Sequence, residues 1–460
     1  MIDLKDLRDH PDKYRDGAAA KRYDAELIEQ LLSADADLRQ AMGEREELTA
    51  EKNRIGKQIG PLMGRLKKPD AGMDDQARRE LETQVESLQQ KSLDLKQREQ
   101  QLHGRIADLE PKRQALWLEV PQPPDPDVPR GQSADDNVEI RRWNPPDFDP
   151  DKSFAQNKGF EPKTHIDLLQ DLGLVDFERG VRLSGSRSYV LSGAAMQLHQ
   201  AVLRLAFDFM TQENGFRAVS APCLVREQTM VGTGFFPHGK DTAYHIANPT
   251  SEDEFYLTGT GEVGLMGLHA DEILDADALP LRYTTLSTCF RREAGAAGKD
   301  TAGLYRIHQF DKVEQVVICR ADEDESRAWH TKMIGFVEAL MQKLGLPYRL
   351  LQCCTADLGP KNADMIDIEC WMPSRGPDGQ GAYGETHSAS RLYDYQTRRL
   401  NIRYKDPATK KNTIAHSLNN TVIASPRVLI PIVEMYQNAD GSITVPQALR
   451  PYLGGLDRIV

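Results

Sequence analysis

The stretch TLSTCFRREAGAAGKDTAGLYRIHQFDKVEQ, from Thr285 to Gln315, carries an arginine, two glutamates and a phenylalanine at spacings that suit strands. Residues two apart on a strand face the same way, so Arg291 and Glu293 are predicted to point into one site. An arginine matches phosphate oxygens with two hydrogen bonds. Phe310 can stack on a base, and Glu314 lies on the same face four residues later. A salt-bridged pair of strands is the alternative interpretation.

Short β-rich segments and turns fill the chain from about Phe255 onward, including EFYLTGTGEV, LRYTTLSTCF, QVVICR and MIDIECWMP. Few of them are separated by patterns long enough for a helix, which favours an antiparallel sheet over alternating strand–helix units. Before them, Ala194–Phe209 has apolar residues on one helical face. We therefore predict an α+β fold, with an antiparallel β-sheet core flanked by helices.

The first third of the chain has the spacing of a coiled coil. Apolar residues recur at alternating intervals of three and four over residues 24–66 and again over residues 80–117. Polar residues interrupt the two apolar seams at Arg45, Lys52, Ser92 and Glu99. The segment between the runs, GPLMGRLKKPDAGMDD, contains glycines and prolines, which stop helices. We expect an antiparallel α-helical coiled-coil arm over about residues 24–117 that folds back within this segment.

Positive charge is concentrated in this arm, although the chain of 460 residues has a formal net charge of -12. Residues 52–68 contain six basic residues and no acidic one: Lys52, Arg54, Lys57, Arg65, Lys67 and Lys68. A solvated helix face would explain such a run. Its position at the tip of a long arm suggests a polyanionic partner instead.

A proline-rich and then acidic segment, VPQPPDPDVPRGQSADD, begins at Val120 and is typical of a linker. It predicts an N-terminal domain over residues 1–119, a linker over residues 120–146 and a globular domain over residues 147–460.

Six cysteines occur without a C-x-x-C pair, so we expect buried reduced thiols and no zinc. The charged N-terminus lacks the apolar region of a signal peptide, and no stretch is long and apolar enough to span a membrane. These features predict a cytoplasmic protein without a membrane partner.

Several stretches resemble one known family. FRREAGAAGKDTAGLYRIHQFDKVE resembles motif 2 of class II aminoacyl-tRNA synthetases, in the form typical of seryl-tRNA synthetases. LSGSRSYVLSGAAMQLHQAVLRLAFDFMTQENGFRAVSAPCLV resembles motif 1, with Pro222 in the family's proline position, and HSLNNTVIASPRVLIPIVEMYQ resembles motif 3. TGEV, DIECWMP and GETHSASRLYDYQTRRLNIRY resemble further family segments, and the arm and linker resemble the family's N-terminal part. The resemblance covers essentially the whole chain.

The resemblance implies a site for ATP and Mg²⁺. Arg291 would grip the α-phosphate, Phe310 would stack on adenine, and Arg427 would contact the γ-phosphate, so that Arg291, Glu293 and Arg427 are the implied catalytic residues. Glu385 and Ser388 resemble the ATP and Mg²⁺ ligands, and a hard cation of this kind prefers oxygen. The remaining implied ATP contacts are Arg292, Glu293, Thr386 and His387.

The resemblance also implies the substrates. The implied serine-binding residues are Thr260, Gly261, Glu262, Arg291, Glu314, Asn419 and Thr421. The implied reaction is ATP-dependent attachment of L-serine to tRNA(Ser) through a seryl-adenylate, with tRNA(Sec) as a further acceptor. A homodimer would bind tRNA across its subunits, and the cationic run of the arm would contact phosphates.

The sequence departs from the family's pattern at a few positions. Arg292, His387 and Arg391 stand where Ser, Ser and Asn are usual, Gly261 replaces Ala, and Pro426 precedes Arg427 where Gly is frequent. None of these changes removes a charged or hydroxyl group that the implied reaction needs, but Arg391 leaves the local structure of its strand open.

Two alternatives remain at this stage. One is a serine-activating relative that transfers serine to an acceptor other than tRNA, such as a carrier protein. The other is a coiled-coil adaptor or chaperone with an inactive globular body.

Overall fold

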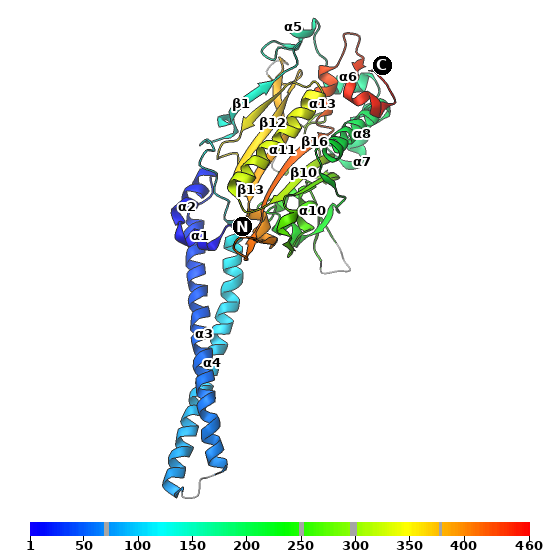
Figure 1. Ribbon diagram of the computed structural model, residues 1–460. Coiled ribbons are helices and arrows are strands. Elements are labelled where there is room, and N and C mark those ends of the chain that lie inside the picture. Colours follow the sequence, from blue (N-terminus) through cyan, green and yellow to red (C-terminus); the bar gives the residue numbers. More distant parts are fainter. Residues whose placement is uncertain (69–72, 248–252, 295–300, 377–379) are drawn as a thin grey trace. The chain divides into compact units, whose positions relative to one another are not determined.

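The computed structural model describes residues 1–68, 73–247, 253–294, 301–376 and 380–460 (Figure 1). The chain divides into two compact units, which are described separately below. One unit, called the arm, contains residues 8–11 and 24–120, and the other, called the body, contains residues 1–7, 12–23 and 121–460.

The regular elements of both units are defined by their residue ranges. The helices are α1 (Leu4–Asp9), α2 (Pro11–Ala20), α3 (Glu26–Lys67), α4 (Asp75–Glu119), α5 (Phe154–Lys158), α6 (His165–Asp171), α7 (Phe177–Ser184), α8 (Gly193–Asp208), α9 (Glu227–Gly232), α10 (Glu262–Gly267), α11 (Glu323–Lys343), α12 (Tyr395–Arg399) and α13 (Leu429–Met435). The strands are β1 (Val138–Trp143), β2 (Val175–Asp176), β3 (Val190–Leu191), β4 (Arg217–Ala218), β5 (Leu224–Arg226), β6 (Tyr244–Ile246), β7 (Phe255–Leu257), β8 (Ile273–Leu274), β9 (Leu281–Phe290), β10 (Gln309–Cys319), β11 (Tyr348–Gln352), β12 (Asp364–Met372), β13 (Ala382–Tyr393), β14 (Arg403–Lys405), β15 (Asn412–Ile414), β16 (His416–Ser425), β17 (Ile443–Thr444) and β18 (Arg458–Ile459).

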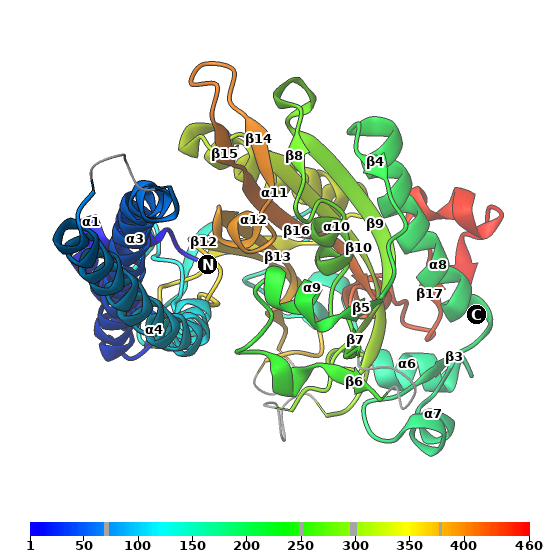
Figure 2. The ribbon, with the colours of Figure 1, turned by 90° about the horizontal axis from the view of Figure 1, so that it is seen from below.

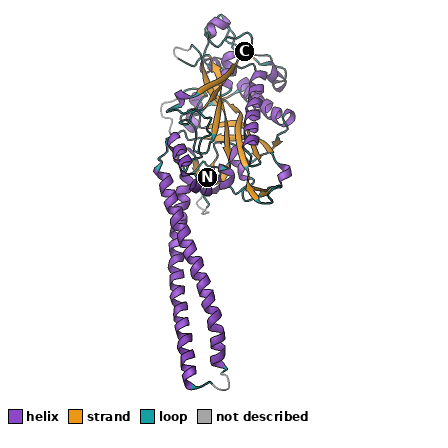
Figure 3. Cartoon of the chain, turned by 60° about the vertical axis from the view of Figure 1, so that its left-hand side comes forward, coloured by secondary structure: helices purple, strands orange, loops and turns teal. Residues whose placement is uncertain are grey.

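The arm is built on the long helices α3 and α4, which pack side by side (Figure 3). Leu38 of α3 packs in one cluster with Ile106 of α4, and Leu48 packs in a second cluster with Leu95. Later residues of α3 therefore meet earlier residues of α4, so the two helices are antiparallel. The predicted coiled-coil arm is confirmed.

Polar residues that interrupt the two apolar seams pair with each other. The Lys52 ammonium forms an ion pair with the Glu99 carboxylate. The Thr49 hydroxyl donates to Glu99 Oε1 at 3.2 Å, and Lys91 Nζ lies 2.7 Å from Glu51 Oε1. Matching polar groups across the seam fix one register of the two helices, because a shifted register would leave them unpaired.

The turn segment expected to begin at Gly60 is helical in its first half. Helix α3 continues through Gly60 and Pro61 to Lys67, and α4 begins at Asp75, where the Asp74 side chain accepts the Ala77 N–H at 2.7 Å. A proline removes one backbone hydrogen bond from a helix. In α3 this loss does not end the helix, because packing against α4 stabilises the turns on the N-terminal side of Pro61.

The body is organised around one large sheet of eight strands in the order β1-β11-β12-β13-β16-β10-β9-β4. Every neighbouring pair in it is antiparallel except β4 and β9, which are parallel. Helices α8 and α11 lie against this sheet (Figure 2) and contribute to the largest cluster of buried apolar side chains. The predicted α+β core is confirmed, and α8 matches the amphipathic stretch that begins at Ala194.

Small sheets surround the large one. They are β5-β7-β6, β15-β14-β8, β17-β18 and β2-β3. No helix among the described residues is both long enough and apolar enough to cross a membrane.

Candidate active site

A cavity in the body gathers most of the predicted nucleotide-binding residues. Those that line it are Arg291, Glu293, Phe310, Glu385, Thr386, His387, Ser388 and Arg427, and Thr421, predicted to bind serine, lines it too. They come from β10, β13 and β16 and from the segments that follow β9 and β16, and these four strands are neighbours in the sheet. Residues separated by more than one hundred positions in the chain thus share one site.

The first part of the cavity is built where β9 ends. The guanidinium carbon of Arg291 lies 5.2 Å from the centre of the Phe310 ring, so the two side chains stack. Glu293 Oε2 forms an ion pair with Arg306 Nη1 at 2.9 Å. We predicted Arg291 and Glu293 on a strand, but β9 ends at Phe290 and Glu293 adopts a positive φ of 52°. A left-handed backbone, not the alternation of a strand, places this carboxylate.

Arg427 closes the cavity from the segment that follows β16. Its Nε donates to the Tyr305 carbonyl at 3.0 Å, and its Nη1 donates to the Glu385 carbonyl at 3.1 Å. Its guanidinium carbon lies 4.4 Å from the centre of the Tyr305 ring. The side chain is therefore held beside Glu385.

A buried polar cluster around Glu314, which is fully buried, adjoins the cavity through Lys312 and Thr421, which line it. Its carboxylate accepts hydrogen bonds from Thr260 Oγ1 and Asn419 Nδ2, each at 3.2 Å. Lys312 forms an ion pair with Glu314 and donates to Thr260 Oγ1 at 2.8 Å and to Thr421 Oγ1 at 3.4 Å. Four of the predicted serine-binding residues are thus brought together.

Lys312 is a member of this cluster that our reading of the sequence missed. It lines the cavity and is 5% exposed. A signal was present, because Lys312 lies two residues before Glu314 on β10 and such residues share one face of a strand. Asn419 Oδ1 is buried and has no hydrogen-bond partner in the described part of the chain.

Three predicted site residues lie elsewhere. Glu262 Oε1 accepts hydrogen bonds from Lys361 Nζ at 2.6 Å and Gln396 Nε2 at 2.7 Å, and this residue does not line the cavity. Arg292 is exposed, and Gly261 packs against β9; neither lines the cavity.

His387 lines the cavity with a fully buried ring. Burial, together with the positive charge of Arg427, lowers the pKa of His387 to about 3. The ring is therefore neutral near pH 7, with one nitrogen able to donate and the other able to accept.

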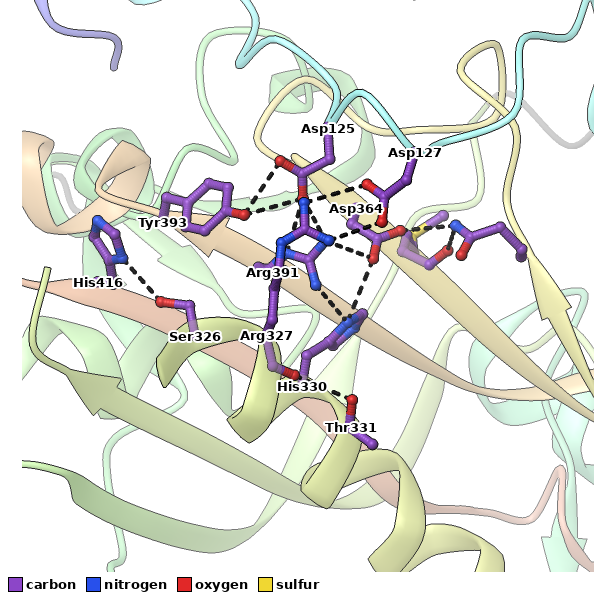
Figure 4. Close-up of polar contacts among 12 residues, drawn as sticks. Asp125, Asp127, Ser326, Arg327, His330, Thr331, Asp364, Arg391, Tyr393 and His416 are labelled. Atoms are coloured by element: carbon purple, nitrogen blue, oxygen red, sulfur yellow. Dashed lines mark hydrogen bonds and ion pairs between the residues drawn. The ribbon is translucent and has the colours of Figure 1, made fainter. Parts of the chain in front are cut away.

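Arg391, whose effect on its strand the sequence left open, does not line the cavity and lies in a polar network with Asp125 and Asp364 (Figure 4). Its Nε donates to Asp125 Oδ2 at 2.9 Å, and its Nη2 lies 3.0 Å from Asp364 Oδ2. The Tyr393 hydroxyl also donates to Asp125. Burial alone would raise the pKa of Asp364, but the hydrogen bond and charge of His330 and the charge of Arg391 hold that pKa well below its usual range. Arg391 thus anchors the proline-rich linker on β13.

The oxygen donors of Glu385 and Ser388 fit a hard divalent cation such as Mg²⁺. Asp367 of β12 pairs with Ser388 in the sheet, and its Oδ1 is buried without a hydrogen-bond partner in the described chain. One further group of possible metal ligands occurs among the described residues, Cys353, Asp357 and Asp367, whose ligand atoms all lie within 4.8 Å of one another.

On the arm, five residues of the cationic run are exposed: Arg54, Lys57, Arg65, Lys67 and Lys68. The sixth, Lys52, is half-buried in its ion pair with Glu99.

Comparison with known families agrees with this geometry. Residues 244–436 match the tRNA synthetase class II core domain (G, H, P, S and T), and residues 1–110 match the seryl-tRNA synthetase N-terminal domain. The body thus contains the core of a class II aminoacyl-tRNA synthetase. The chain is 42% identical over 456 residues to the serine–tRNA ligase of Deinococcus radiodurans, which covers 99% of this chain and 98% of that protein. It belongs to the seryl-tRNA synthetase family.

Two solved structures are similar over essentially the whole chain. The seryl-tRNA synthetase of Pyrococcus horikoshii complexed with ATP has a TM-score of 0.86 at 35% identity, covering 100% of this chain and 99% of that one. The cytoplasmic serine–tRNA ligase of Naegleria fowleri in complex with AMP has a TM-score of 0.83 at 27% identity, covering 100% and 98%.

Proposed function

We propose that the chain activates L-serine with ATP and transfers it to tRNA(Ser). The observation that carries this proposal is one cavity lined by Arg291, Glu293, Arg427 and Lys312, with Lys312 in turn paired with the buried Glu314. The cavity offers cationic groups for phosphates beside a buried carboxylate for an amine, which is what a mixed anhydride of serine and AMP requires.

The first step joins serine to the α-phosphorus of ATP. A serine carboxylate oxygen attacks that phosphorus, the bond to the bridging oxygen breaks, and pyrophosphate leaves. Arg291 neutralises charge at the α-phosphate, Phe310 stacks on adenine, and Arg427 contacts the γ-phosphate. Because the carboxylate is already a nucleophile at neutral pH, positioning and charge neutralisation provide the catalysis.

Mg²⁺ bound by Glu385 and Ser388 would neutralise phosphate charge when present. The neutral His387 ring stands between these ligands on β13 and can exchange a hydrogen bond with the nucleotide. Thr386 is turned into the sheet, where its hydroxyl donates to the Ile368 carbonyl at 3.0 Å, so its role is to hold the strand.

Serine itself would occupy the cluster around Lys312. The Glu314 carboxylate accepts hydrogen bonds from the serine ammonium, and Thr421, with Thr260 and Asn419 nearby, contacts the serine hydroxyl. Alanine would leave these buried groups unpaired, so a site of this kind rejects it strongly. Glu262 supports the site indirectly, through its bonds to Lys361 and Gln396.

In the second step the terminal 3′-hydroxyl of tRNA attacks the carbonyl carbon of the adenylate, and AMP leaves. The exposed cations of the arm contact tRNA phosphates by charge and shape. We propose that two chains form a homodimer that binds tRNA across its subunits, that tRNA(Sec) is a further acceptor, and that the protein works in the cytoplasm. We retain residues 1–119, 120–146 and 147–460 as the tRNA-binding domain, linker and catalytic domain.

Serine-dependent ATP–pyrophosphate exchange, with threonine, alanine and glycine as competitors, tests activation. Charging of tRNA(Ser) tests transfer. Exchange without charging would favour the alternative of a different acceptor, and absence of both would refute the proposed activity.

The arm has its own test. Deleting residues 50–98 and joining Thr49 to Glu99 by a short Gly–Ser turn shortens both helices at a point where they are hydrogen-bonded. We expect pyrophosphate exchange to be unchanged and charging to fall by at least about a hundredfold, as expected for loss of several phosphate contacts. Normal charging by this variant would rule out a role of the arm in tRNA binding.

A further inference from the structure

His165 is a buried histidine that none of the steps above uses. It begins helix α6, which is capped by the Thr164 side chain, and it is 8% exposed. Its Nδ1 lies 2.8 Å from Glu434 Oε1, and its Nε2 accepts the backbone N–H of Leu304 at 3.2 Å. One imidazole thus joins α13, which carries Glu434, to the chain segment at Leu304.

The hydrogen-bond partners fix the form of this ring. A backbone N–H can only donate, so Nε2 must carry the lone pair, and the proton of the neutral ring must be on Nδ1. Nδ1–H then donates to Glu434, which also accepts from the His165 backbone N–H at 2.8 Å and from Ser374 N and Oγ at 2.9 and 2.6 Å. The Glu434 carboxylate is fully buried, and these four hydrogen bonds provide its partners.

The chain passes very close to the ring at Gly303. Gly303 has a φ of 75°, a conformation that glycine adopts readily and other residues adopt rarely. A Cβ at this position would lie 2.4 Å from His165 Nε2. Both the backbone conformation and the available space therefore require glycine where the segment rests on the imidazole.

The two residues that follow Leu304 contact the nucleotide site directly. The Tyr305 carbonyl accepts a hydrogen bond from Arg427 Nε at 3.0 Å, and Arg306 Nη1 pairs with Glu293 Oε2 at 2.9 Å. Leu304, Tyr305 and Arg306 all line the cavity. Three consecutive residues thus connect His165 to two side chains proposed to act on ATP.

We propose that His165 is a positioning residue for the nucleotide site, acting through the Leu304 amide; this inference rests on the proposed function. The Nε2 lone pair fixes residues 303–306 on the body, and the fixed segment holds Glu293 and Arg427 in place for the triphosphate. Loss of that lone pair alone lets the segment shift and weakens ATP binding, while serine still finds its own pocket.

Two substitutions separate the two ring nitrogens. In His165→Asn the amide nitrogen takes the place of Nδ1 and keeps the bond to Glu434, with no atom left to accept from Leu304. In His165→Gln the longer side chain places its oxygen near Nε2 and keeps the bond to Leu304. Thr164→Ala is the matched control, because it removes the cap of the same helix without a contact to residues 303–306.

The first measurement is hydrogen exchange at the Leu304 amide in the full-length protein without ligands. We expect His165→Asn to speed this exchange about tenfold, the effect of losing one hydrogen bond, and His165→Gln and Thr164→Ala to leave it within about twofold of the unsubstituted protein. The second measurement is serine-dependent pyrophosphate exchange. Here His165→Asn should raise the KM for ATP about tenfold and leave the KM for serine within about twofold.

The proposal is overturned if His165→Asn changes neither Leu304 exchange nor the KM for ATP, or if Thr164→Ala raises that KM equally. It is also overturned if both kinetic constants for serine and ATP change in parallel, which a merely structural role predicts. If the unsubstituted protein shows no serine-dependent pyrophosphate exchange, the proposed function fails. The hydrogen-exchange rate of the Leu304 amide then still decides whether His165 anchors residues 303–306.

Discussion

Replacing Lys312 by methionine should destabilise the protein by more than the loss of its hydrogen bonds alone. Lys312 is 5% exposed and Glu314 is fully buried, so the substitution leaves a carboxylate in the interior without its counter-ion. Methionine fills a similar volume, which keeps a cavity from contributing to the result.

The expected size follows from the pair. Removing one partner of a buried ion pair costs about 3–5 kcal/mol, since the remaining charge is uncompensated. Replacing both partners, as in Lys312→Met with Glu314→Gln, removes that charge and leaves mainly the loss of the hydrogen bonds to Thr260 and Thr421, about 1 kcal/mol each. The double variant should therefore be more stable than the single one by about 1–3 kcal/mol.

Urea unfolding followed by tryptophan fluorescence measures both variants, because Trp143, Trp329 and Trp371 all lie in the body. The matched control is Lys163→Met, which breaks an exposed ion pair with Asp171 at 2.7 Å and should leave the unfolding midpoint unchanged. A single variant within about 1 kcal/mol of the unsubstituted protein, or a double variant less stable than the single one, would refute the reasoning. Both Lys312 variants should lose serine-dependent pyrophosphate exchange.

Four further outcomes are expected. Thr421→Val should reduce the preference for serine over alanine by about tenfold to a hundredfold, the effect of one buried hydrogen bond; an unchanged ratio in competitive exchange would contradict its placement. Glu293→Ala should abolish adenylate formation, measured as pyrophosphate exchange, and retained exchange would argue against the site. Burial lowers the pKa of His416 below 6.5, so as pH falls through 6.5 the unfolded chain binds a proton more readily than the folded chain and stability decreases; His416→Gln should show a flatter loss in urea unfolding between pH 7 and 5. A thiol reagent should react in the native protein first at Cys223, the half-buried cysteine, because the other five are buried; equal reaction at all six would contradict the packing.

Much of the fold could be predicted, because hydrophobic periodicity reports directly on which faces are buried. The heptad spacing predicted the coiled-coil arm, and the short β-rich segments predicted the antiparallel sheet. The end of α3 could not be predicted in this way: Pro61 usually stops a helix, and local preference was overridden by packing against α4.

The site was partly predictable for a different reason. Arg291 and Arg427 both line the cavity, and the resemblance to motifs 2 and 3 had marked them as site residues. Glu262 could not be placed from spacing, since its orientation depends on Lys361 and Gln396, which lie 99 and 134 residues later in the chain. His165 lies outside the quoted motifs, and only tertiary structure brings it to Leu304, which lies within the motif 2 stretch.

The arm holds its exposed cations at fixed positions along the helix axis. The continuous helix α3 sets the axial distance of each exposed cation from its start, about 45 Å for Lys57 at 1.5 Å per residue, and the Lys52–Glu99 pair matches one register of α3 and α4. Inserting one heptad into α3 before Lys52 and one into α4 after Glu99 would keep the pairing of the two helices. It would carry the cations about 10 Å further from the start of α3. Reach and charge could then be varied independently, and an RNA lengthened to match would reveal whether distance alone selects the partner.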